Sequence, residues 1–146
     1  MTEFDHDRLD VYRAAIEFVA LANGVVERLP RGRGYLADQL QRASTSIALN
    51  IAEGAGEFSG KDKVRFYRMA KRSATECAAI LDVVRGLALT DPNALQPGRE
   101  LLLRIVSMLI RMARSVRVSG TGTGTGTEQS QTEEDAEIGL PHGFIG

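Results

Sequence analysis

The sequence predicts an all-α fold, an antiparallel up-down-up-down four-helix bundle followed by a disordered C-terminal tail. Apolar residues recur at spacings of three and four over four long segments of residues 1–118. Short connections rich in Gly and Pro join these segments, which favours antiparallel neighbours. No stretch of residues 1–118 alternates apolar and polar side chains with the period of a strand, so no sheet is expected.

The first helix is expected from about Asp7 to Leu29, with Asp5 or Asp7 as its N-cap. Pro30 ends it, and residues 31–34 form a turn. Its predicted apolar stripe comprises Leu9, Tyr12, Ile16, Val19 and Val26.

The second helix is expected from about Tyr35 to Glu53, with Gly54 as its C-terminal stop. Its predicted apolar stripe comprises Leu36, Leu40, Ala43, Ile47 and Ile51. The third helix begins after Ser59, a good N-cap with Asp62 three residues on, and continues to about Leu89.

The fourth helix is expected from about Ala94 to Val118, after a break at residues 90–93. Its predicted apolar positions are Leu101, Leu102, Ile105, Met108, Leu109 and Met112. Three further apolar residues are candidates for an oligomer interface if they project away from the bundle centre: Leu49, Val83 and Leu87.

Composition restricts the class of protein. Aromatic residues make up 5% of the chain and Trp is absent, so the core must be built from Leu, Ile, Val, Ala and Met. The single Cys77 excludes an internal disulfide and a cysteine-cluster metal site, and it is expected to be buried. The N-terminus is polar and acidic, unlike a secretory signal, and no segment is apolar enough to span a membrane. A cytoplasmic protein is expected.

The C-terminal 28 residues differ sharply from the bundle, which is placed at residues 1–118. Residues 120–127 are a Gly-Thr repeat and residues 128–137 are polar and acidic, so both are expected to be disordered. All 18 Lys and Arg lie in residues 1–118, against 14 of the 19 acids. The bundle therefore carries +4 and the tail, residues 119–146, carries −5.

The end of the tail becomes apolar again. This is the layout of a docking peptide on a tether, similar to the loading peptides of encapsulin cargo proteins, and the alternative is a C-terminus under weak selection. The candidate protein-docking residues are Ile138, Leu140, Phe144 and Ile145.

A polar stripe runs beside the apolar stripe of the second helix, and two residues of the third helix complete it. Its members are Gln39, Arg42, Ser46, Asn50, Glu53, Ser73 and Glu76. One interpretation is a structural network between helices, in which Arg42 pairs with Glu53 or Glu76 and Asn50 bonds the backbone or a serine hydroxyl. The other is a ligand site. We favour the structural interpretation, because the charges balance.

Two stretches carry a resemblance to a known family: 40–54 (LQRASTSIALNIAEG) and 66–76 (FYRMAKRSATE). They resemble the signature of the four-helix bundle proteins associated with 23S rRNA intervening sequences, and the resemblance extends over about residues 8–118. That family is similar to the accessory protein of diversity-generating retroelements. The resemblance implies a four-helix bundle, a homopentameric ring with a basic surface, and nucleic acid or a reverse transcriptase as partners.

Basic residues follow one face of the third helix and one face of the fourth. They are Lys61, Arg65, Arg68 and Arg72, and Arg104, Arg111, Arg114 and Arg117. Rows of Arg on a rigid helix can meet phosphates without reading bases. The alternative is a solvated helix face.

Catalysis has little support in the sequence. His6 and His142 lie near the two ends of the chain, far from a plausible partner, and no Glu-x-x-His occurs on any helix. We therefore expect no enzyme, no cofactor and no metal. The leading hypothesis is a homo-oligomeric scaffold that binds RNA or DNA electrostatically. The alternative is a protein-interaction adaptor that captures its partner through the tail.

Overall fold

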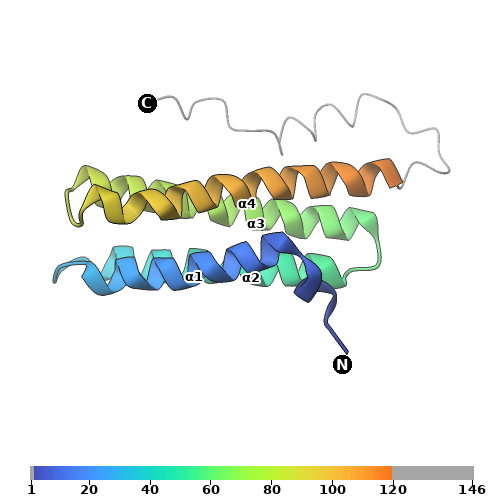
Figure 1. Ribbon diagram of the computed structural model, residues 1–146, viewed down its shortest axis with the longest axis horizontal. Coiled ribbons are helices and arrows are strands. Elements are labelled where there is room, and N and C mark those ends of the chain that lie inside the picture. Colours follow the sequence, from blue (N-terminus) through green and yellow to red (C-terminus); the bar gives the residue numbers. More distant parts are fainter. Residues whose placement is uncertain (1, 120–146) are drawn as a thin grey trace.

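The computed structural model describes residues 2–119, which form four long helices in an antiparallel bundle (Figure 1). A short 3-10 helix, η1, precedes them. The elements are η1 (Asp5–Arg8), α1 (Asp10–Arg28), α2 (Gly34–Gly56), α3 (Gly60–Gly86) and α4 (Pro92–Ser119). Each helix packs on the next, and α4 packs back on α1. The predicted all-α four-helix bundle is confirmed. The predicted tail lies outside the described residues.

The core is mainly aliphatic, with the rings of Phe18 and Tyr67 among its side chains. Its largest fully buried side chains include Phe18, Leu40, Ile47, Ile51, Leu81, Leu102, Ile105 and Leu109. All five stripe residues expected in α2 are buried, and the expected apolar positions of α4 are buried or packed against the core. Between residues 2 and 119, no helix combines the length and apolar content that crossing a bilayer requires.

The expected stripe of α1 is confirmed in part. Leu9, Tyr12 and Val26 are partly buried and pack against the core, Val19 is partly buried, and Ile16 is 46% exposed. The fully buried face lies part of a turn away and consists of Val11, Ala14, Ala15, Phe18, Ala22 and Val25. Three of these are alanines, which let neighbouring helices approach closely, so the large aliphatic residues were a poor guide to the buried face.

The start of α1 also differs from the prediction. Its N-cap is Leu9, which provides no side-chain cap, and neither Asp5 nor Asp7 caps the helix. Asp7 lies in η1, where its Oδ2 accepts a hydrogen bond from the backbone N–H of Phe4 at 2.9 Å. Asp7 thus stabilises the preceding 3-10 turn and not α1 itself.

Gly54 does not end α2, contrary to the prediction. The helix continues to Gly56, and Gly54 is buried against α3. A Cβ at Gly54 would lie 2.7 Å from Cε1 and 2.9 Å from Cδ1 of Tyr67. The absence of a side chain therefore permits the close approach of α2 to α3.

Lys63 of α3 completes the C-terminus of α2. Its Nζ donates hydrogen bonds to the carbonyl oxygens of Ala55 at 2.8 Å and Gly54 at 3.2 Å. Carbonyls in the last turn of a helix have no partner within the helix, and a cation there also favours the helix dipole.

The N-terminus of α3 is capped as predicted. Ser59 Oγ accepts a hydrogen bond from the N–H of Asp62 at 3.0 Å and donates one to the carboxylate of Asp62 at 3.0 Å. The other end differs, since α3 stops at Gly86. Ala88 has a φ of 54°, and the N–H groups of Ala88 and Leu89 bond the carbonyls of Arg85 and Val84. This is a Schellman ending with Ala in the position that Gly usually occupies.

The fourth helix begins two residues earlier than expected. Asp91 Oδ1 accepts a hydrogen bond from the N–H of Asn93 at 2.9 Å, so Asp91 caps the helix. Pro92 then occupies the first helical position, where its missing N–H costs nothing.

The close approach at Gly54 leads to a stability prediction. Gly54→Ala should lower the free energy of unfolding by about 1–3 kcal/mol, because the added methyl overlaps the ring of Tyr67. Gly24→Ala is the matched control: no atom lies within 4 Å of a Cβ there, so it should stabilise α1 by about 0.5–1 kcal/mol. Denaturant unfolding of both variants measures this. Equal effects of the two substitutions would contradict the close contact.

Candidate nucleic-acid interface

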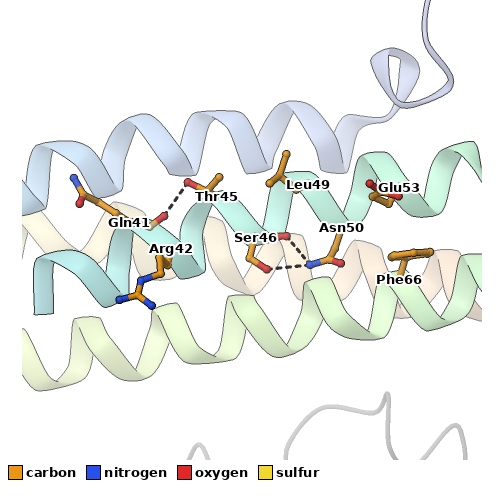
Figure 2. Close-up of a pocket in the computed structure, with 8 residues that line it drawn as sticks. All are labelled: Gln41, Arg42, Thr45, Ser46, Leu49, Asn50, Glu53 and Phe66. Carbon is orange, nitrogen blue, oxygen red and sulfur yellow. Dashed lines mark hydrogen bonds between the residues drawn. The ribbon is translucent and has the colours of Figure 1, made fainter. Parts of the chain in front are cut away.

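The polar stripe brings three of its seven residues into one hydrogen-bonded cluster between α2 and α3. Asn50 Nδ2 donates to the carbonyl oxygen and to the Oγ of Ser46, both at 2.9 Å (Figure 2). Ser73 Oγ of α3 donates to the same Ser46 Oγ at 2.9 Å. All three side chains are partly buried, so these bonds join the two helices away from bulk water.

The other four members of the stripe, Gln39, Arg42, Glu53 and Glu76, are exposed. In the described part of the chain Arg42 forms no ion pair with Glu53 or Glu76, in contrast to the expected pairing. Arg42 and Glu53 are eleven residues apart on one helix, or about 16 Å along its axis, which is too far for contact.

A shallow, open groove lies over this part of α2 (Figure 2). Seven α2 residues and one α3 residue line it: Gln41, Arg42, Thr45, Ser46, Leu49, Asn50, Glu53 and Phe66. A small-molecule site usually encloses most of its ligand. This groove is largely open to solvent, so its shape suits a surface contact better than an enclosed small molecule.

The Ser46–Ser73 hydrogen bond should be measurable as a coupling energy. In a double-mutant cycle of Ser46→Ala and Ser73→Ala, the two substitutions should be non-additive by about 0.5–1.5 kcal/mol in the free energy of unfolding. The control cycle replaces Ser73→Ala by Ser107→Ala, since Ser107 is an exposed serine of α4. In this control cycle the effects of Ser46→Ala and Ser107→Ala on the free energy of unfolding should be additive. Additivity in both cycles would mean that the bond does not contribute.

Charge is divided unequally between the two halves of the bundle. Residues 60–119, which hold α3 and α4, contain twelve Lys and Arg against five Asp and Glu, a net charge of +7. Residues 1–59, which hold α1 and α2, contain six basic against nine acidic residues, a net charge of −3. The modest net charge of the whole bundle thus conceals one strongly basic pair of helices.

The basic row predicted on α3 lies on the outer side of that helix. Lys61, Arg65 and Arg72 are exposed, and Arg68 is half-buried. The Arg65 guanidinium lies 5.1 Å from the ring centroid of Phe66 and 3.9 Å from the carboxylate of Asp62. Burial, with a smaller contribution from the charge of Arg68, lowers the pKa of neighbouring Lys71.

The basic row predicted on α4 is exposed at Arg104, Arg111 and Arg114. Arg117 belongs to the last turn of α4, and the position of its side chain is outside the described structure. Arg99 of α4 forms an ion pair with Asp82 of α3, and the two basic helices pack side by side. Both rows therefore lie on helices that pack against each other.

The three outward apolar candidates are exposed: Leu49 by 60%, Val83 by 44% and Leu87 by 47%. One exposed residue that sequence reasoning missed is Phe58, in the connection between α2 and α3, which is 104% exposed. Its setting between Gly56 and Gly60, outside the predicted helices, was a signal that it lies outside the core. The four docking residues predicted in the tail, from Ile138 to Ile145, lie outside the described residues.

Within residues 2–119, no group of three or more His, Cys, Asp or Glu side chains could hold a metal ion. Cys77 is fully buried, and its burial, together with the charge of Glu76, raises the pKa of its thiol to about 12. A thiol in that state is a packing residue and a poor nucleophile.

Cys77 should be inert in the folded protein. Alkylation by iodoacetamide at pH 8 should be slow and should become fast only in denaturant, because the thiol is buried and protonated. Because the pKa of the Cys77 thiol is higher in the folded state than in the unfolded state, the protonated thiol contributes to the free energy of unfolding below about pH 9. This contribution is lost as the pH rises toward 12. Burial also raises the pKa of the Tyr67 hydroxyl, which acts in the same direction. Stability should therefore fall over this range less steeply in Cys77→Ala, which retains the contribution of Tyr67. Rapid alkylation of the native protein would contradict this placement.

Fold and charge together define a small antiparallel four-helix bundle protein with one strongly basic pair of helices. The chain belongs to the 23S rRNA-intervening sequence protein family, whose family model matches residues 7–111. The match spans all of α1, α2 and α3 and most of α4, including both stretches that carry the resemblance. No curated protein matches the chain.

Proposed function

We propose that this protein is a non-enzymatic, homo-oligomeric scaffold whose α3–α4 face binds RNA or DNA through its phosphates. The observation that carries the proposal is the charge of +7 on residues 60–119, against −3 on the other half of the bundle. A solvated helix face needs charges of both signs, but it does not need a surplus of this size on one pair of helices.

The geometry of the basic rows supports phosphate contact without base reading. From Lys61 to Arg72 the α3 row extends about 16 Å along one rigid helix. Arg and Lys presented in this way can neutralise successive phosphates, and such contacts carry no sequence information. Binding should therefore show little sequence preference.

Exposed apolar residues support the self-association of the chain. Leu49, Val83, Leu87 and Leu103 are large apolar residues with 44–60% of their surface exposed. A second copy would cover part of this surface, and the family resemblance points to a five-membered ring. A ring repeats the α3–α4 face around its axis and so multiplies the charge that one bundle presents. The family is named for an insertion in 23S rRNA, so RNA is the first ligand to test.

Removing charge from the α3 row tests the proposal. The triple variant Lys61→Gln, Arg65→Gln, Arg72→Gln should weaken binding to RNA of any sequence. It should also reduce the slope of log K against log salt by about 0.7–0.9 for each phosphate that the protein no longer neutralises. Fluorescence anisotropy across a salt series measures both.

The matched control removes the same charge from the other half of the molecule, with Arg13→Gln, Arg28→Gln and Arg31→Gln. These three residues are exposed in and after α1, and their replacement should leave affinity nearly unchanged. Equal reductions in affinity in the two variants would show that only total charge matters. Absence of binding by the wild type at low salt would reject the proposal and favour a protein partner.

A further inference from the structure

Phe58 stands out among the exposed apolar residues. It is 104% exposed, whereas the other large exposed apolar residues range from 44% to 74%. A single exposed apolar side chain needs no special explanation by itself. The setting of Phe58 provides two further observations, one on rigidity and one on charge.

The backbone on both sides of Phe58 is fixed. The N–H of Glu57 bonds the carbonyl of Gly54 at 3.2 Å, which closes the end of α2. Ser59 caps α3 through the N–H of Asp62, and Lys63 ties the last carbonyls of α2 to α3. The connection between α2 and α3, at the right-hand end of the bundle in Figure 1, therefore presents the ring from a rigid support.

Phe58 also lies next to the start of the basic row on α3. Residues 57–72 contain six Lys and Arg against two acids, Glu57 and Asp62, a net charge of +4. Exposed Lys61 and Arg65 follow Phe58 within the first two turns of the helix. A polyanion that follows this row toward the N-terminus of α3 reaches the ring at its end.

We propose that Phe58 stacks on an unpaired base of a single-stranded nucleic acid whose phosphates contact Lys61, Arg65 and Arg72. An aromatic ring beside a cationic track is the combination by which proteins hold single strands without reading their sequence. In a duplex the bases are stacked on one another and offer no free face except at the ends. This inference rests on the proposed function and deepens it, because it names single strands as the preferred ligand.

Fluorescence gives a direct test, since the chain contains no Trp. Phe58→Trp places a single reporter at the proposed contact. Titration with single-stranded poly(U) should quench its emission as the strand binds, while the long duplex of poly(A) and poly(U) should bind with little quenching. A Tyr35→Trp variant places the reporter on an exposed aromatic position in the first turn of α2, at the far end of that helix from Phe58, and should show no quenching with either ligand. Binding of poly(U) by the Phe58→Trp variant without a change in its emission would overturn the inference.

Affinity gives an independent test. Phe58→Ala and Phe58→Leu should both weaken single-strand binding about tenfold and leave duplex binding unchanged, whereas Phe58→Trp should retain single-strand affinity. The salt dependence should stay that of the wild type, because no charge is removed. An unchanged salt dependence therefore distinguishes the loss of stacking in the Phe58 variants from the loss of phosphate contacts in the Lys61→Gln, Arg65→Gln, Arg72→Gln variant.

The remaining outcomes are distinguishable. If the wild type binds RNA and all Phe58 variants bind it equally well, the inference fails and the proposed function stands. If the wild type binds no nucleic acid, both fail. If Phe58→Ala and Phe58→Leu change the molar mass measured by light scattering and leave affinity per protomer unchanged, Phe58 contacts a second copy of the chain, and the stacking role is rejected.

Discussion

The contact between Gly54 of α2 and the ring of Tyr67 of α3 sets the distance and the register between the two central helices. At that separation Ser46 lies opposite Ser73, and Lys63 reaches the last carbonyls of α2. The same contact turns the Phe66–Tyr67 pair so that Tyr67 enters the core, where burial raises the pKa of its hydroxyl, while Phe66 lines the open groove. The polar cluster, the helix end and the short connection all depend on this one close approach.

Much of the fold could be predicted because helical periodicity constrains it directly. The number of helices, their order, the buried stripe of α2 and the cap at Ser59 follow from local spacing and local hydrogen bonding. The errors occur where one residue type serves two purposes. In the sequence Gly54 indicates a helix stop, because Gly often ends helices, but in the structure it makes room for a ring, and only the neighbouring helix decides between these roles. In α1, alanines form much of the buried face, and a stripe chosen by side-chain size lies beside the most deeply buried positions.

The candidate site could be predicted only in part. Two residues on one face of a helix are known to point to the same side, but a shared face does not show that their side chains are close enough to interact. Lys61, Arg65 and Arg72 are exposed together because spacings of four and seven fix their side of the helix. Arg42 and Glu53 share a face equally well, yet three turns separate them. The concentration of charge on α3 and α4 emerges only when charge is counted by helix within the bundle. Phe58 has the chemistry of a core residue; its place between Gly56 and Gly60 indicates that the core does not include it, and the structure shows how fully it is exposed.

The unequal charges of the two helical hairpins, α1–α2 and α3–α4, affect how the free protein is oriented before it meets a charged partner. A positive hairpin side by side with a negative one gives the bundle a permanent electric dipole directed across its width. In the electric field of a polyanion, the free protein rotates so that α3 and α4 face the polyanion. This orientation shortens the orientational search that precedes a productive collision. Between copies of the chain, the same dipole favours side-by-side arrangements in which the α1–α2 hairpin of one copy faces the α3–α4 hairpin of the next. It disfavours arrangements that bring two like hairpins together.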